Sequence, residues 1–155
     1  MSVSRLLLVF ALLGLMFVEV QKLVAQQDAN RDELYARTDT AALVQDLARR
    51  TGDFKEEFNR AVEHSLLDGT KLEDRAKHTA DNLHDSAKKL KDVFEDKRDK
   101  NHPAVREQAD RTMATGSELS RIITAHRFTE KVQHDWDLIR SDLDALARVY
   151  NLPPL

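Results

Sequence analysis

The stretch DGTKLE at residues 68–73 marks the most specific structural boundary in the chain. Gly69 can adopt the left-handed backbone conformation that ends a helix. Thr70 and Glu73 have the spacing of a capping box, in which the two side chains bind free amides at a helix start. The stretch therefore predicts one helix before it and a second helix that begins directly after Thr70.

Apolar and small residues recur every third or fourth position on both sides of this turn, which is the spacing of one helix face. The earlier stripe stays in phase across Gly52, which favours one continuous helix over a restart at Asp53. The later stripe fades within residues 97–100. The first stripe comprises Leu43, Leu47, Thr51, Phe54, Phe58, Ala61, Val62 and Ser65, and the second comprises Leu72, Ala76, Thr79, Leu83, Ser86, Leu90, Val93 and Phe94.

Two more helices are expected after these. The triplet Asn-His-Pro at residues 101–103 interrupts the chain, and proline suits the first turn of a new helix. Thr129 is a candidate cap for the last helix, and Asn151, followed by two prolines, ends it. The third stripe comprises Val105, Ala109, Thr112, Gly116, Leu119, Ile123 and His126, and the fourth comprises Val132, Trp136, Ile139, Leu143, Leu146, Ala147 and Tyr150.

Four amphipathic helices joined by short turns predict an all-α fold, an antiparallel four-helix bundle over residues 38–152 with a tail at 153–155. The small residues in the stripes make room for large ones across the core, although they could instead leave it poorly packed. An up-down-up-down order predicts two juxtapositions: Trp136 level with Phe58, Thr79 and Leu119, and Phe54 near Gly116.

The chain begins with a short apolar run. Residues 6–18 follow Arg5 and hold no charged side chain, but they fall short of the about 20 residues that a membrane-spanning helix needs. A positive residue, a short apolar stretch and a small residue such as Ala25 at the cleavage site are typical of a signal peptide. We expect a signal peptide at 1–25 and a flexible lead-in at 26–37. The mature protein would be extracytoplasmic, either periplasmic or secreted. An uncleaved N-terminal anchor is the alternative.

The composition excludes several kinds of chemistry. The chain has no cysteine, so it has no disulfide, thiolate metal site or cysteine nucleophile. It also lacks a glycine-rich phosphate loop. Its net charge is −3, and the lysines within residues 88–100 alternate with acidic side chains, which favours a solvated surface over a nucleic-acid site. We expect no catalytic residue, no cofactor and no nucleic-acid partner.

The six histidines are the remaining candidates for metal binding. His126 continues the third core stripe, and His64 flanks the first stripe near the same end of the bundle. These two are retained as candidate ligands, but the other histidines do not share their direction, and we expect no native metal site. His78 and His84 lie beside inward-facing positions, His102 lies in a turn, and His134 faces solvent.

The last helix carries a resemblance. Residues 136–151, WDLIRSDLDALARVYN, and more weakly residues 65–70, are similar to small exported bacterial helical-bundle proteins of unknown function. The resemblance implies a secreted or periplasmic bundle with no known activity, and it assigns no role to any residue.

Two functions are compatible with these patterns. We expect a non-catalytic exported bundle that binds another protein or has a structural role in the envelope, with membrane contact only through the signal segment. The protein partner and the oligomeric state are not specified by the sequence. The alternative is a bundle that binds a metal or a lipid surface, since the second helix has a thin apolar face and many lysines.

Overall fold

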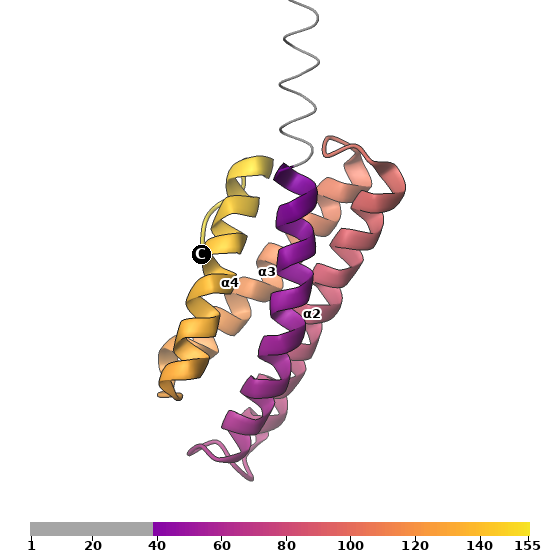
Figure 1. Cartoon of the computed structure of the whole chain (residues 1–155). Coiled ribbons are helices and arrows are strands. Elements are labelled where there is room, and N and C mark those ends of the chain that lie inside the picture. Colours follow the sequence, from indigo (N-terminus) through magenta and orange to yellow (C-terminus); the bar gives the residue numbers. More distant parts are fainter. Residues whose placement is uncertain (1–38) are drawn as a thin grey trace, which may run out of the picture. The chain divides into compact units, whose positions relative to one another are not determined.

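The computed structural model describes residues 39–155, which form one compact unit of helices without any strand. The first helix covers residues 39–63 and is followed by α2 (Lys71–Lys97), α3 (Pro103–Ala125) and α4 (Glu130–Tyr150) (Figure 1). The predicted all-α bundle is confirmed for these residues. The predicted signal peptide at 1–25 and lead-in at 26–37 lie outside the described residues.

The turn between the first helix and α2 is longer than predicted. The first helix ends at residue 63, so Gly69, with a φ of 72°, lies inside the turn rather than at a helix end. The Ser65 side chain explains the early end, because its hydroxyl donates to the Val62 carbonyl at 2.8 Å and accepts from the Leu67 amide at 3.1 Å. These bonds replace the next helical turn, as serine side chains near a helix end often do.

The start of α2 confirms the predicted cap. The Thr70 hydroxyl accepts from the amides of Leu72 and Glu73 at 3.2 and 3.3 Å. The Glu73 carboxylate accepts from the Gly69 amide at 2.7 Å, one residue earlier than in an ideal capping box. The hydrogen bond from the Lys77 ammonium, followed by that from the Gly69 amide, lowers the pKa of Glu73.

The boundaries of α3 also follow local chemistry. α2 ends at Lys97, and Arg98 caps it with a φ of 52° and an amide that donates to the Phe94 carbonyl. Pro103 begins α3, as predicted. The cap is supplied by His102, whose Nδ1 accepts from the Ala104 amide at 3.2 Å. Because Nδ1 accepts here, the neutral imidazole holds its proton on Nε2.

Predicted caps also bound α4. The Thr129 hydroxyl accepts from the Val132 amide at 3.3 Å. At the other end Asn151 has a φ of 53°, and the Leu152 amide donates to the Ala147 carbonyl at 2.8 Å. Together with the bond from the Asn151 amide to the Arg148 carbonyl, this forms a Schellman motif.

The core runs along the whole bundle and is made by residues from all four helices. The predicted stripes are correct in period but shifted by one residue at two places, where Val44 and Ala87 are buried instead of Leu43 and Ser86. Of the two adjacent predicted residues Val93 and Phe94, only Phe94 is buried. The largest fully buried side chains are Phe54, Phe58, Leu47, Leu83, Leu90, Leu119, Ile139, Leu143 and Leu146. Because this closed core belongs entirely to one compact unit, we expect residues 39–155 to fold on their own.

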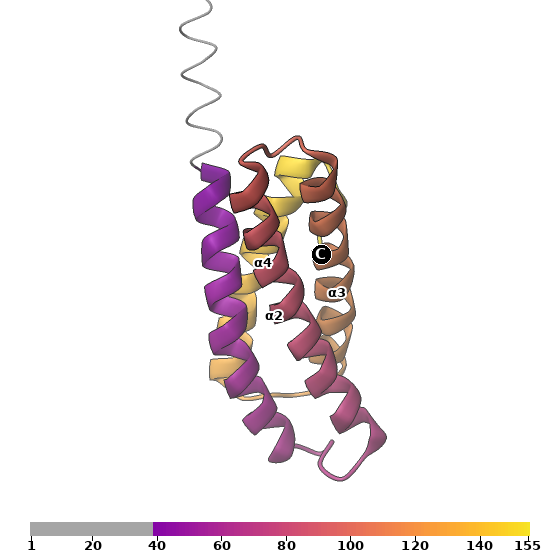
Figure 2. The ribbon, with the colours of Figure 1, turned by 90° about the vertical axis from the view of Figure 1, so that its right-hand side faces the viewer.

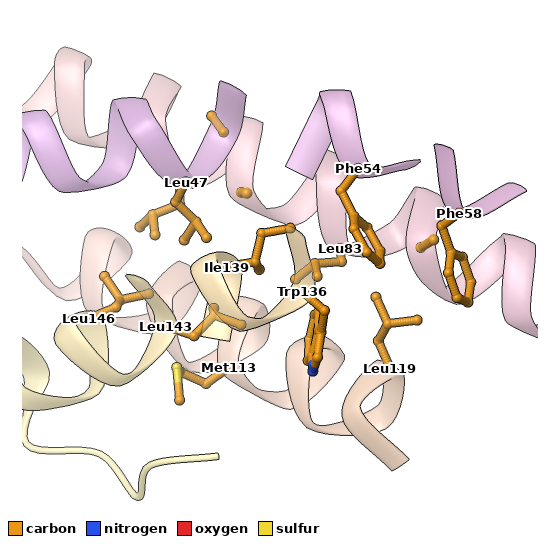
Figure 3. Packing of buried hydrophobic residues seen from close by; sticks show 14 of the residues in the cluster. Leu47, Phe54, Phe58, Leu83, Met113, Leu119, Trp136, Ile139, Leu143 and Leu146 are labelled. Atoms are coloured by element: carbon orange, nitrogen blue, oxygen red, sulfur yellow. The ribbon is translucent and has the colours of Figure 1, made fainter. Parts of the chain in front are cut away.

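Aromatic residues fill the middle of this core. Trp136 is only 3% exposed, and its ring centroid lies 5.9 Å from that of Phe54, in agreement with the predicted burial. In Figure 3 the indole is drawn beside Leu119, with Phe54 above it. Phe58 stacks on Phe54 at 5.2 Å and meets Phe128 at 5.0 Å.

Two glycines allow close approach between helices. A Cβ on Gly116 would lie 2.8 Å from Leu143 Cδ1, so the absence of a side chain admits α4. The predicted neighbour of Gly116 was Phe54; the atoms nearest to it instead belong to Leu143 and Leu155. Gly52 similarly faces the His84 ring, which would lie 3.1 Å from an added Cβ.

Polar pairs between neighbouring helices occur in a regular order. Among these pairs, the residue number on one helix falls as the residue number of its partner on the neighbouring helix rises. Figures 1 and 2 show turns 64–70 and 126–129 at one end of the bundle and turn 98–102 at the other. The pairs are Lys55–Asp81 and Glu63–Lys77, then Arg75–Glu118 and Ser86–Gln108, then Arg50–Asp142 and Glu57–Lys131.

Candidate functional site

The two histidines retained as metal candidates occupy connecting segments. His64 is exposed and directly follows the first helix. His126 is half-buried and follows α3 with an extended backbone, at a φ of −129°. The expectation that His126 continues the core stripe is wrong, because α3 ends at Ala125. Among residues 39–155, no group of three or more histidine or acidic side chains is placed to hold a metal ion.

The remaining histidines have local contacts or face water. His102 caps α3, and His84 lies against Gly52 with its Nδ1 3.5 Å from the Thr51 hydroxyl. His78 and His134 are exposed. The histidines are therefore distributed over separate parts of the bundle.

One surface hollow lies between the first helix and α4. It has a volume of about 430 Å³, with charged side chains on its walls, Phe54 beneath and Leu138 at its edge. Leu138 is 40% exposed, more than any other leucine within the described helices. We call this hollow the α4 groove, and its lining residues are Arg49, Arg50, Asp53, Phe54, Lys131, Asp135 and Leu138.

The charges of the α4 groove largely neutralise one another. Lys131 Nζ lies 2.7 Å from Asp135 Oδ2, and this hydrogen bond raises the pKa of Lys131. Arg49 pairs with Asp46 at 3.3 Å and with Asp53 at 3.6 Å. The groove therefore presents neither a strongly positive nor a strongly negative face to a ligand.

A less exposed ion pair lies beside the groove. Arg50 Nε is 3.2 Å from Asp142 Oδ2, but the two atoms are not aligned as a hydrogen bond, and no described residue supplies either with another partner. Burial is the main reason that the pKa of Asp142 is raised, against the opposing effect of Arg50. The pair joins the first helix to α4, although desolvation offsets part of its attraction.

A second hollow lies between α3 and residues 152–155, where the last residues of the chain fold back. Leu155 donates its amide to Asp144 Oδ1 at 2.9 Å, and its carbonyl accepts from Arg140 Nη2 at 3.4 Å. Its side chain lies 3.5 Å from the Cβ position of Gly116. In Figures 1 and 2 the end of the chain accordingly lies midway along the bundle.

Sequence reasoning missed both hollows. Residues 153–155 were predicted only as a tail, yet Leu155 is half-buried and contacts the core. The signal was the spacing of Leu152 and Leu155, three residues apart around two prolines. The α4 groove carried a weaker signal, since Leu138 is an apolar residue off the core stripe.

A polar layer joins α2 to α3. The Ser86 carbonyl accepts from the Gln108 side chain at 3.1 Å. The single hydroxyl proton of Thr112 is shared between the Gln108 carbonyl at 2.9 Å and the Ser86 carbonyl at 3.3 Å. Both donors are buried, so these bonds satisfy groups that would otherwise be costly inside the core. Their role is to fix how α2 meets α3.

In the part of the chain that the structure describes, no helix is long and apolar enough to cross a membrane. Comparison of the chain with protein-family models, with curated proteins and with solved structures finds no match. The function of this chain is therefore inferred from its sequence and from the surfaces of the bundle.

Proposed function

We propose that this chain is a non-catalytic, exported, antiparallel four-helix bundle that binds another protein or has a structural role in the envelope. The opposite order of the paired residues on neighbouring helices supports the antiparallel arrangement. The apolar run at residues 6–18 supports export through a signal peptide at 1–25. On this proposal, the signal peptide directs export and the bundle carries out the function outside the cytoplasm.

The α4 groove is the single observation that carries the binding role. An exposed leucine at the edge of the groove, with the buried Phe54 beneath and charges of both signs on the walls, combines the apolar and polar side chains that protein interfaces use. Val149 is also exposed and lies 11 residues after Leu138, which places both on one face of α4. Small ligands are bound in more enclosed and more apolar pockets.

A photo-crosslinking amino acid at Leu138 tests this role in the native envelope. We expect a discrete crosslinked product of defined mass, and an Asp53→Lys change in the groove wall should reduce its yield. The matched control carries the crosslinker at Leu66, which is 99% exposed in a turn outside the groove. Equal products from both positions would show that the groove has no special role.

Two further measurements separate the alternatives. The intact mass of the full chain after expression in a bacterium should lack residues 1–25, whereas retention of Met1 would favour an anchor. Zinc titration and liposome flotation of residues 39–155 test the metal-binding and lipid-binding alternatives. Tight zinc binding that is lost in His126→Ala would replace the present proposal with metal binding.

A further inference from the structure

Met113 carries the only sulfur atom within residues 39–155. The chain has no cysteine, and its other two methionines are Met1 and Met16. The Met113 side chain belongs to the hydrophobic core but lies at its edge, with 7% of the residue exposed. Methionine is oxidised to its sulfoxide, which turns a flexible apolar side chain into a polar one. Met113 is therefore the one position in the bundle at which this reaction can occur.

A surface hollow leads to Met113. The hollow has a volume of about 270 Å³, and its walls include Met113 and Ser117 of α3 together with residues 152–155. In Figure 3 the Met113 side chain is drawn on the side of the core where the yellow end of the chain runs. The thioether is therefore screened from solvent on this side by a short segment instead of by a packed helix.

The last four residues of the chain, 152–155, which we call the strap, are held to the bundle by few contacts. Leu152 and Leu155 are partly buried against the core, whereas the two prolines between them are exposed and have no amide to donate. The Leu155 amide donates to Asp144 Oδ1 at 2.9 Å, and its carbonyl accepts from the exposed Arg140 at 3.4 Å. A segment with so few buried contacts opens at a lower free-energy cost than the helices do.

Oxidation changes the polarity of the surface that the strap covers. The Met113 sulfur attacks one oxygen of hydrogen peroxide with a lone pair, so that an S–O bond forms and the O–O bond breaks. The leaving hydroxide takes the proton of the transferred hydroxyl group and departs as water. The sulfur has then lost two electrons, which the peroxide has gained. The new oxygen accepts hydrogen bonds that the side chains of Leu152 and Leu155 cannot donate, so a docked strap would leave it poorly solvated.

We propose that Met113 is an oxidation site, and that its conversion to the sulfoxide by a hydroperoxide releases the strap from α3. Methionine sulfoxide reductases restore the thioether, so the release is reversible. None of the residues that line the α4 groove takes part, so either proposal can fail without the other.

The first test measures how fast Met113 reacts. Residues 39–155 are treated with hydrogen peroxide and oxygen uptake is followed by intact mass, with the peptide of residues 110–117, DRTMATGS, as the fully exposed reference. We expect the folded protein to react at least about ten-fold more slowly than the peptide, because the strap and the core cover the sulfur. Leu155→Asp should release the strap by placing a charge against the core, and should react at least about five-fold faster than the wild type. Leu138→Asp, which places the same charge in the α4 groove, should react at the wild-type rate.

The second test measures release of the strap. The Leu155 amide is bonded to Asp144, so the exchange of its proton with water, followed by nuclear magnetic resonance, reports whether the strap is docked. Oxidation should speed this exchange at least about five-fold, and sulfoxide reductases should reverse the change. Met113→Leu keeps the apolar volume without the sulfur, so it should take up no oxygen and its exchange should not respond to peroxide. Met113→Gln, with a polar group of similar length, should speed the exchange without peroxide.

Several results would overturn the proposal. Equal oxidation rates of the wild type and the peptide, or of the wild type and Leu155→Asp, would show that the strap does not protect Met113. Oxidation only in urea that unfolds the protein would show that the hollow gives no access. Unchanged exchange of the Leu155 amide after oxidation would show that the strap stays docked. Loss of the far-UV circular dichroism on oxidation would show that the sulfoxide unfolds the whole bundle instead of releasing the strap.

Discussion

The replacement Trp136→Ala tests the centre of the bundle. The Trp136 side chain is 97% removed from solvent, given its 3% exposure, and its ring meets Phe54 of the first helix. Aromatic residues of this size bury about 150–250 Å². At about 25 cal/mol per Å², that area corresponds to roughly 4–6 kcal/mol, of which an alanine at the same site retains about 1 kcal/mol. We therefore expect a loss of about 3–5 kcal/mol, as in other large-to-small core changes.

Urea unfolding of residues 39–155, followed by far-UV circular dichroism, measures this loss, since the variant has no tryptophan to report by fluorescence. Leu138→Ala is the matched control. It lies two residues away on the same helix but is 40% exposed, and we expect it to change the free energy of unfolding by less than about 0.5 kcal/mol. The difference between these two variants isolates burial from helix propensity.

A loss below about 1 kcal/mol for Trp136→Ala would refute the reasoning, because a buried indole cannot be removed so cheaply from a packed core. The wild-type fluorescence provides a second check. A tryptophan emission maximum equal to that of free indole in water would contradict the buried position of Trp136 against Phe54.

Three other variants test local features by the same unfolding assay. Thr70→Ala should cost about 1 kcal/mol because α2 loses its cap, whereas Thr115→Ala, which removes only an exposed bond within α3, should be neutral or stabilising; equal effects would argue against the cap. His102→Ala should cost about 1 kcal/mol and His102→Asn much less, since asparagine is a good cap. Tyr150→Phe should be neutral or stabilising, because no described residue gives the buried hydroxyl a hydrogen-bond partner. Burial, with a smaller effect of Asp99, raises the pKa of Tyr150 from 10.0 to about 12. Between these pH values the phenol ionises in the unfolded chain but not in the folded one, so the free energy of unfolding of the wild type should fall as pH rises. Tyr150→Phe should not show this fall.

Helix boundaries were the most predictable features, because they depend on residues close together in the chain. Pro103, Thr129 and Asn151 occupy the start or end of a helix as expected, and Thr70 binds two amides of α2. The first helix was the exception, since Ser65 ends it before Gly69 is reached. Serine can continue a helix or end it, and the sequence alone does not decide between the two.

The buried face was predictable in period but not in every residue. Val93 and Phe94 are adjacent, and either could continue the stripe of α2; the structure buries Phe94. Similarly, Gly116 was correctly expected to admit a large residue, but that residue is Leu143 instead of Phe54. Adjacent positions on a helix differ by about 100° in direction, so the choice between them depends on the neighbouring helices.

The candidate sites were almost entirely decided by tertiary structure. The α4 groove requires the first helix to lie beside α4, which brings Arg50 next to Asp142, 92 positions later in the chain. The docked segment requires Leu155 to meet both Asp144 and Gly116. The sequence by itself determined four amphipathic helices and most of their caps, because these depend on periodicity and on hydrogen bonds within a few residues. Only the packed bundle decided which faces meet and which hollows remain, because those depend on side-chain volumes from separate helices filling one shared space.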